Sequence, residues 1–156
     1  MKSAIFSILF FLSHMSQAQT ESLPIITGTL NDTLFQSEWF ANWSHSKGYK
    51  PDAETMASLE KINSENLSFK VYLGTWCEDS QIHVPAFLVV AAMLNWKYEL
   101  IGANREKECP FEKKNCKNWD ITKLPTIVVY QELIEKGRII ETPELSVEKD
   151  LLKIIQ

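Results

Sequence analysis

The sequence LSFKVYLGTWCEDSQIHVPAFLVV, residues 67–90, decides the fold of this chain. In its first seven residues apolar side chains alternate with others, a period-two pattern that is typical of a strand with one buried face. The short segment 74–77 ends this strand, and the residues from 79 to about 95 carry apolar side chains on two helical faces. The stretch therefore predicts a strand and a largely buried helix, joined by a turn that contains Cys77.

Three sets of apolar residues define the expected buried surfaces of this unit. The strand contributes Leu67, Phe69, Val71 and Leu73, which alternate with Ser68, Lys70 and Tyr72. One face of the helix carries Ile82, Ala86, Val89 and Met93. Another face carries Phe87, Val90 and Leu94.

Further elements are expected on both sides of this unit. Before it, apolar residues at helical spacing predict a helix over 34–45, and Asp52 is a good N-cap for a second helix with the stripe Met56, Leu59 and Ile62. After it, we expect a strand over 98–101, a polar linker over 104–123, a strand over 126–130, a turn at 135–137, a strand over 138–141 and a helix over 147–155. The last helix has the apolar face Leu151, Leu152 and Ile155. The order strand, helix, strand, linker, hairpin, helix predicts an α/β fold.

The first 18 residues have a different composition from the rest, since Lys2 is their only charge and residues 4–12 are an apolar run. This run is too short to span a bilayer, which takes about 20 apolar residues. Ser16 and Ala18 are small residues at the positions that a signal peptidase requires. We therefore predict a signal peptide over 1–18, cleaved after Ala18, and a periplasmic or secreted protein in which disulfides can persist.

Composition excludes several classes of protein. Of 156 residues 45% are hydrophobic and 23% are charged, and the formal net charge is -4, so a disordered tail and a basic nucleic-acid binder are excluded. The chain after residue 18 contains no further apolar run long enough to cross a membrane. The three cysteines are an odd number, which leaves one thiol over if the other two pair.

The turn and two later landmarks resemble the thioredoxin superfamily. Trp76-Cys77-Glu78-Asp79-Ser80 looks like the Trp-Cys-x-x-Cys active-site turn with Ser80 in place of the second cysteine. Pro85 falls where thioredoxins carry a helix-kinking proline, and Leu124-Pro125-Thr126 resembles the cis-proline segment that faces the active cysteine. The resemblance covers residues 67–156 and implies a thioredoxin-like fold, with a central mixed sheet flanked by helices. Residues 19–66 then form an N-terminal extension packed on that fold, supplying a strand and one or two helices.

Cys77 is the candidate nucleophile. A cysteine just before a helix points its sulfur toward unpaired backbone N–H groups, which favours the thiolate. The carboxylates of Glu78 and Asp79 oppose this effect. Ser80 cannot act as a second thiol, so we expect it only to hydrogen-bond the sulfur of Cys77. The resemblance implies that Trp76, Leu124, Pro125 and Thr126 shape a groove for an extended peptide.

Cys109 and Cys116 leave several pairings open. In the family topology they lie in the segment before the cis-proline, and they can pair with each other across the loop CPFEKKNC. Alternatively, Cys109 resolves the mixed disulfide of Cys77, or both cysteines are free. The pairing with each other is the simplest arrangement, because it leaves Cys77 as the odd thiol.

Two departures from the family pattern limit the expected chemistry. The buried acid that thioredoxins carry six residues before the first cysteine is Val71 here, and neighbouring Lys70 is expected on a solvated face unless it extends toward the active-site edge. A peroxide-reducing enzyme of the superfamily would need Thr or Ser at position 74, which is Gly74. His83 lies too far along the helix to be expected as a base or metal ligand for Cys77, and we expect neither a metal nor a cofactor.

The sequence therefore predicts monothiol thiol–disulfide exchange through Cys77, by which protein disulfides are reduced or isomerised. The expected partners are a cysteine-containing protein or peptide and a low-molecular-weight thiol, with no nucleic acid. The alternative is a redox-inactive module of the same fold that holds a peptide or partner protein in the cis-proline groove. The missing second cysteine favours the module, whereas a retained thiol in an oxidising compartment favours exchange.

Overall fold

The computed structural model describes residues 24–37, 40, 43, 48–107 and 120–156. It contains a five-stranded mixed sheet in the order β1-β3-β2-β4-β5. The strands are β1 (Gly28–Leu30), β2 (Leu67–Leu73), β3 (Tyr98–Gly102), β4 (Thr126–Gln131) and β5 (Ile134–Ile140). The helices are the 3-10 helix η1 (Asp32–Gln36) and the α-helices α1 (Ala53–Leu59), α2 (Glu78–Met93) and α3 (Val147–Ile155). The predicted α/β class and the predicted order from β2 to α3 are confirmed.

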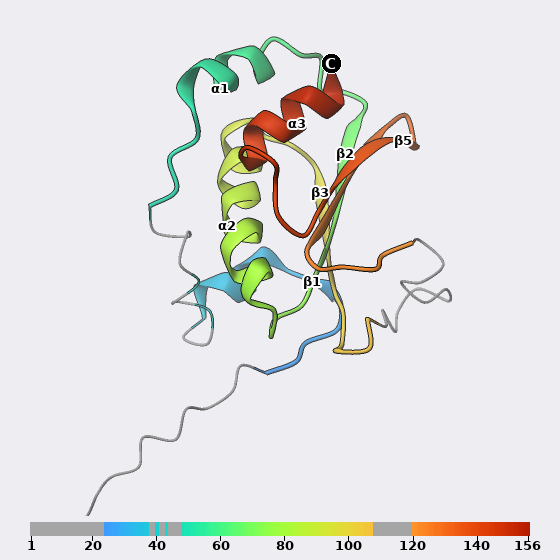
Figure 1. Ribbon diagram of the computed structural model, residues 1–156. Coiled ribbons are helices and arrows are strands. Elements are labelled where there is room, and N and C mark those ends of the chain that lie inside the picture. The colour runs from blue at the N-terminus through green and yellow to red at the C-terminus, as the bar shows by residue number, and fades with distance from the viewer. Residues whose placement is uncertain (1–23, 38–39, 41–42, 44–47, 108–119) are drawn as a thin grey trace, which may run out of the picture.

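Strand β2 lies at the centre of the sheet and carries the chain toward the predicted site. It pairs in parallel with β3 and antiparallel with β4, whereas β1 joins β3 and β5 joins β4, both antiparallel. The parallel pair β2 and β3 is connected by α2, as a parallel pair requires a crossover. In consequence the C-terminal end of β2, the start of α2 and the end of β3 meet at one edge of the molecule (Figure 1).

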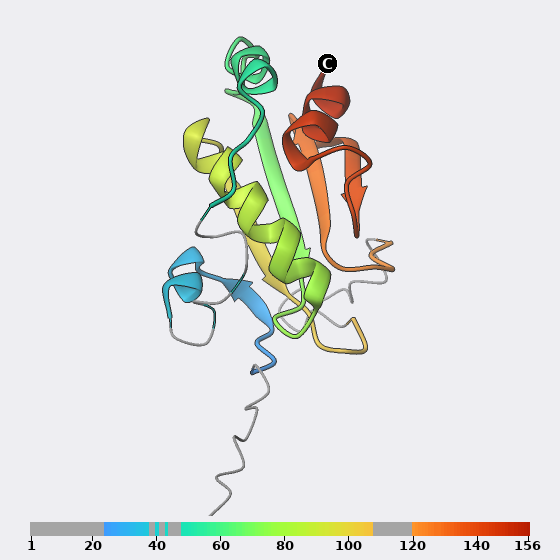
Figure 2. The same cartoon turned by 60° about the vertical axis from the view of Figure 1, so that its left-hand side comes forward.

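The main core lies between the sheet and the helices, which all cover the same face (Figures 1 and 2). The predicted inward residues of β2, Leu67, Phe69, Val71 and Leu73, are all buried here. Phe69 stacks on Trp96, with ring centroids 4.6 Å apart. Stacked and edge-on aromatic contacts of this kind add to the free energy of burial.

A smaller cluster occupies the opposite face of the sheet near the end of β2. Tyr72, which the alternation placed on the outer face of β2, is completely buried. It packs with Ile101, Ala103, Ile121, Leu124 and Val128, and with the partly buried Trp76 and Cys77. This apolar cluster therefore covers the outer face of the sheet at the end that carries the turn.

The buried face of α2 differs from the prediction. Ile82 and Met93, which were assigned to a buried stripe, are 36% and 58% exposed. The fully buried apolar residues of α2 are Val84, Phe87, Val90 and Ala91. The helix is apolar on nearly all sides, so periodicity alone carries no information on which side meets the sheet.

The turn of the β4–β5 hairpin was also wrongly placed. We expected it at 135–137, but these residues lie inside β5, and the turn falls at Glu132 and Leu133, which both have positive φ. Gly137 instead packs under α3, where a Cβ would lie 3.1 Å from Ile154 Cγ2. A glycine required by close packing was therefore taken for a turn signal.

The N-terminal segment contributes one strand and two short helices among the described residues. The expected helix over 34–45 is wrong as a continuous element, because η1 ends at Gln36 and Ser37 is extended. The Ser37 hydroxyl donates to the Leu34 carbonyl oxygen at 2.7 Å and so competes with helix continuation. The predicted start of α1 at Asp52 is confirmed, since its carboxylate accepts the Thr55 N–H.

Two features bear on the predicted location. In the part of the chain that the structure describes, no helix is long and apolar enough to cross a membrane. The predicted signal peptide over residues 1–18 lies outside the described residues and stays a prediction.

Candidate functional site

Cys77 is the N-cap residue of α2, in an extended conformation with φ -93° and ψ 123°. Its N–H donates to the Gly74 carbonyl at 3.0 Å, and its own carbonyl accepts the Gln81 N–H at 3.1 Å, so the turn leads directly into the helix. The side chain makes no cap hydrogen bond. The sulfur is instead half-buried and directed across the molecule toward the segment before β4.

The contact partner of the sulfur is Leu124. Cys77 Sγ donates to the Leu124 carbonyl oxygen at 3.4 Å, across 47 residues of sequence. The Leu124–Pro125 peptide bond is cis, as the resemblance led us to expect. Leu124, Pro125 and Thr126 are buried, and the Thr126 hydroxyl donates to the Lys123 carbonyl at 2.8 Å. The structure thus brings together the turn and the Leu-Pro-Thr segment.

Trp76 forms the wall on the β3 side of the sulfur. Its indole Nε1 donates to the Ala103 carbonyl oxygen, just beyond β3, at 3.1 Å. The guanidinium carbon of Arg105 lies over the ring, 4.8 Å from its centroid. The ring is therefore held by a hydrogen bond at its edge and by a cation over its face.

Ser80 has a different role from the one expected. Its side chain is completely buried, and Oγ accepts the Gly74 N–H at 3.2 Å. Among the described residues no hydrogen bond joins Ser80 to the sulfur of Cys77. This hydrogen bond joins Gly74, before Cys77, to the first turn of α2, and so it holds the backbone around Cys77 in place.

The remaining predicted residues fall around this site or away from it. Glu78 is exposed and Asp79 half-buried at the start of α2. Val71 is completely buried, and Lys70 forms an ion pair with Glu99 at 3.7 Å on the outer face of the sheet. Cys109 and Cys116 lie outside the described residues.

His83 lies apart from the sulfur, beside a small pocket between α2 and the segment 142–147. No group of three or more His, Cys, Asp or Glu side chains in the described ranges is placed to hold a metal ion.

Two residues of the site were missed by the sequence analysis. Thr75 is completely buried, and its hydroxyl donates to the Pro24 carbonyl at 2.6 Å while accepting the Ile26 N–H at 3.1 Å. Arg105 lies on Trp76, although 29 residues separate them in the sequence. The small residue Thr75 between a strand and a cysteine was a usable signal, whereas nothing local distinguishes Arg105.

Comparison with known proteins defines the fold and no more. No family model matches the sequence, and no curated protein matches it. The structure is similar to the crystal structure of a protein of unknown function from Pseudomonas aeruginosa, with a TM-score of 0.54 and 18% identity over 68% of this chain and 74% of that chain. It is also similar to an HIV epitope-scaffold, with a TM-score of 0.54 and 19% identity over 70% of this chain and 76% of that one. These likenesses support a mixed α/β fold.

Proposed function

We propose that this chain is an exported, thioredoxin-like protein that carries out monothiol thiol–disulfide exchange through Cys77. The observation that carries the proposal is the contact between Cys77 Sγ and the Leu124 carbonyl oxygen, at 3.4 Å. It places a half-buried thiol at the start of a helix against a cis Leu-Pro segment, an arrangement that resembles the active site of the thioredoxin superfamily. The strand order and the helix between β2 and β3 are compatible with that fold.

The reaction follows from the chemistry of a single sulfur. The Cys77 thiolate attacks one sulfur of a substrate disulfide, a new S–S bond forms between Cys77 and that sulfur, and the other substrate sulfur leaves as a thiolate. A second thiol then attacks the bond to Cys77, takes the substrate sulfur into a new disulfide and releases Cys77 as a thiolate.

The second thiol has to come from outside the turn, because residue 80 is a serine whose hydroxyl is bonded to Gly74. The candidate sources are another cysteine of the substrate, a low-molecular-weight thiol, or Cys109 or Cys116 of this chain. When a cysteine of the substrate attacks the substrate sulfur, Cys77 is released and the result is isomerisation. For net reduction the second thiol attacks the sulfur of Cys77 instead, so that the substrate leaves as a second thiolate, and a further thiol then releases Cys77 by forming a disulfide with the second thiol.

A second candidate is a redox-inactive module of the same fold that holds a peptide in the groove beside Pro125. Serine at position 80 favours it, because its hydroxyl is bonded to the Gly74 N–H and the turn holds no second thiol. The two candidates differ in turnover, since a binding module retains the groove but leaves substrate disulfides unchanged.

Reactivity of Cys77 separates these candidates. The unreduced protein is treated with iodoacetamide and digested, and we expect carbamidomethylation at Cys77. The same protein is then added to scrambled ribonuclease with glutathione, with the C77S variant as the matched control. Recovery of ribonuclease activity above the C77S level supports exchange. Recovery equal to C77S, with Cys77 free to alkylate, contradicts exchange and supports the binding module.

A further inference from the structure

Arg105 is the residue of this site that the proposed exchange chemistry does not use. It follows β3 by three residues and is exposed, yet its guanidinium is held on the ring of Trp76, the neighbour of the reactive thiol, at 4.8 Å from the centroid. A cation held on an aromatic face loses little further side-chain entropy when it binds an anion, and the N–H groups at its edge stay available for one.

Arg105 differs in its pairing from four other cations of the described residues. Lys70, Lys123, Arg138 and Lys153 each form an ion pair with a glutamate. Within the described residues no carboxylate lies at ion-pair distance from Arg105. Its charge is therefore not neutralised by a neighbour in this part of the chain.

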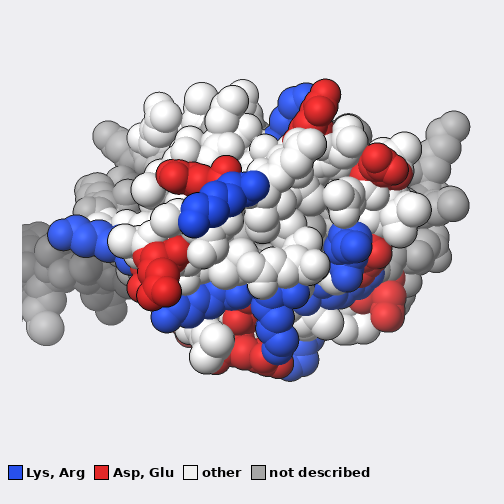
Figure 3. All heavy atoms as spheres, turned by 90° about the horizontal axis from the view of Figure 1, so that it is seen from above, with Lys and Arg blue, Asp and Glu red and all other residues white. Residues whose placement is uncertain are grey.

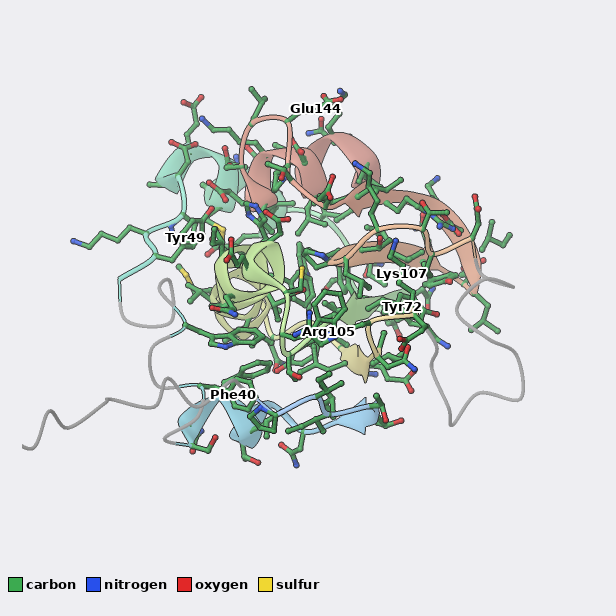
Figure 4. The ribbon with its side chains drawn as sticks, turned by 60° about the horizontal axis from the view of Figure 1, so that its bottom comes forward. Phe40, Tyr49, Tyr72, Arg105, Lys107 and Glu144 are labelled. Carbon is green, nitrogen blue, oxygen red and sulfur yellow. The ribbon has the colours of Figure 1, made fainter. Side chains whose placement is uncertain are left out.

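The space beside Arg105 is an open groove of about 460 Å³, lined by Arg105, Glu106, Lys107, Ile121 and Thr122. Lys107 Nζ donates to the Thr122 carbonyl oxygen, which keeps a second cation at the groove. Ile121 belongs to the same apolar cluster as Trp76 and Cys77, so the groove borders the wall of the thiol site. Figure 4 looks onto this end of the molecule and labels Arg105 and Lys107 there.

The charges on the two sides of the sulfur are opposite. On the α2 side lie the carboxylates of Glu78 and Asp79, whereas the groove carries two cations and one carboxylate, Glu106. At the far end of the molecule, by contrast, acidic and basic side chains lie beside one another (Figure 3). Among the described residues, the groove therefore contributes positive charge on the β3 side of Cys77.

We propose that Arg105 and Lys107 select disulfides that carry a carboxylate next to the reacting sulfur, and that this carboxylate binds in the groove beside Trp76. The inference rests on the proposed function of Cys77 and adds the charge of its substrate. In the exchange step the carboxylate stays unchanged, while the disulfide gives one sulfur to Cys77 and releases the other as a thiolate. Arg105 is accordingly a binding residue for the substrate.

The test measures the rate at which Cys77 reacts with three small disulfides of different charge: dithiobis-nitrobenzoate, which is anionic, dithiodipyridine, which is neutral, and cystamine, which is cationic. Each rate is divided by that of β-mercaptoethanol with the same reagent, which removes differences in intrinsic reactivity. C77S supplies the blank for the other cysteines. We expect the wild-type protein to prefer the anionic reagent at low salt, and the preference to fall at high salt because ions screen the charge.

Variants then assign the preference to Arg105. R105E is expected to lower the relative rate with the anionic reagent by about fivefold, because a charge reversal within about 8 Å of the anion changes its local concentration by that order. R105K keeps the charge and the preference. K61E makes the same change in net charge at an exposed residue beyond α1, roughly 20 Å away at the other end of β2, and should leave the preference unchanged. R105Q replaces R105E if circular dichroism shows R105E to be unfolded.

The outcomes are distinct. Equal relative rates for the three reagents, or a preference that R105E and R105Q leave intact, overturn the inference while the exchange function stands. Absence of any reaction at Cys77 overturns both. Two peptide disulfides are then compared, one with Glu and one with Lys beside the cysteine. A faster reaction of the Glu peptide shows that the selected carboxylate belongs to a polypeptide. A preference limited to the small anionic reagent assigns the groove to a low-molecular-weight disulfide.

Discussion

Thr75 and Pro24 are joined across 51 residues of sequence by a hydrogen bond of 2.6 Å from the Thr75 hydroxyl to the Pro24 carbonyl oxygen. The same hydroxyl oxygen accepts the Ile26 N–H at 3.1 Å. Thr75 is completely buried and lies two residues before Cys77. The segment that precedes β1 is thus attached directly to the turn that carries the thiol.

Loss of this hydroxyl should loosen the N-terminal segment. T75V keeps the volume of the side chain but leaves the Pro24 carbonyl and the Ile26 N–H without their partner, which should lower the free energy of unfolding by about 1–3 kcal/mol. Urea denaturation measures this loss, and amide exchange should accelerate at Ile26 and in β1. T75S retains the hydroxyl and serves as the control. Wild-type exchange rates in T75V would show that the attachment contributes nothing.

A second thiol at position 80 should convert the site to a dithiol enzyme. S80C places a cysteine three residues after Cys77, where it can attack the mixed disulfide from within the chain. We expect the rate of insulin reduction with dithiothreitol to rise about tenfold or more over wild type. S80A, which also loses the hydrogen bond to Gly74, is the matched control and should give no such gain. Equal rates in S80C and S80A would contradict the exchange site.

Glu148 should make the stability of the fold depend on pH. It is 3% exposed, and its carboxylate accepts the Tyr49 hydroxyl at 2.5 Å and the Asp52 N–H at 3.1 Å, which joins α3 to the start of α1. Burial raises the pKa of Glu148, but these hydrogen bonds outweigh it and hold the pKa below the ordinary value of 4.5. Burial and the same carboxylate raise the pKa of Tyr49, which therefore stays protonated as the donor.

The sign of the pH effect follows from the lowered pKa of Glu148. Its stabilisation is complete above the unfolded value of 4.5 and is lost as the pH falls through the lower folded value. At neutral pH, E148Q should be less stable than wild type by about 1–3 kcal/mol, and the difference should shrink below pH 4.5. Urea denaturation over a pH series measures this, with Y49F as a second variant. A difference that is constant with pH would exclude the carboxylate as its source.

Gly74 should tolerate no side chain. A Cβ at this position would lie 2.9 Å from Trp76 Cε2 and 3.1 Å from the Cβ of Cys77. G74A should therefore displace the indole from Ala103 and lower the free energy of unfolding by about 1–3 kcal/mol. Thermal unfolding measures the loss. G48A is the control, because a Cβ there would meet nothing within 4 Å, and its effect should be within about 0.5 kcal/mol. Equal melting temperatures for the two variants would argue against the close contact.

Local patterns predicted the elements around the site well. The alternation over 67–73 and the N-cap residue Asp52 correspond to β2 and to the start of α1. Such signals are reliable because side-chain periodicity and capping are satisfied within a few residues. The same sequence misplaced the hairpin turn, since Glu132 and Leu133 adopt positive φ without the glycine that usually marks it.

The sequence by itself determined that a strand delivers Cys77 to the start of a buried helix, and that a Leu-Pro-Thr segment precedes a second strand. Both follow from interactions between near neighbours in the chain. Only the tertiary structure decided that the Cys77 sulfur contacts the Leu124 carbonyl, that Ser80 bonds to Gly74, and that Arg105 lies on Trp76. These contacts depend on the order and register in which β3 and β4 flank β2, and on the packing that this arrangement imposes on residues far apart in sequence.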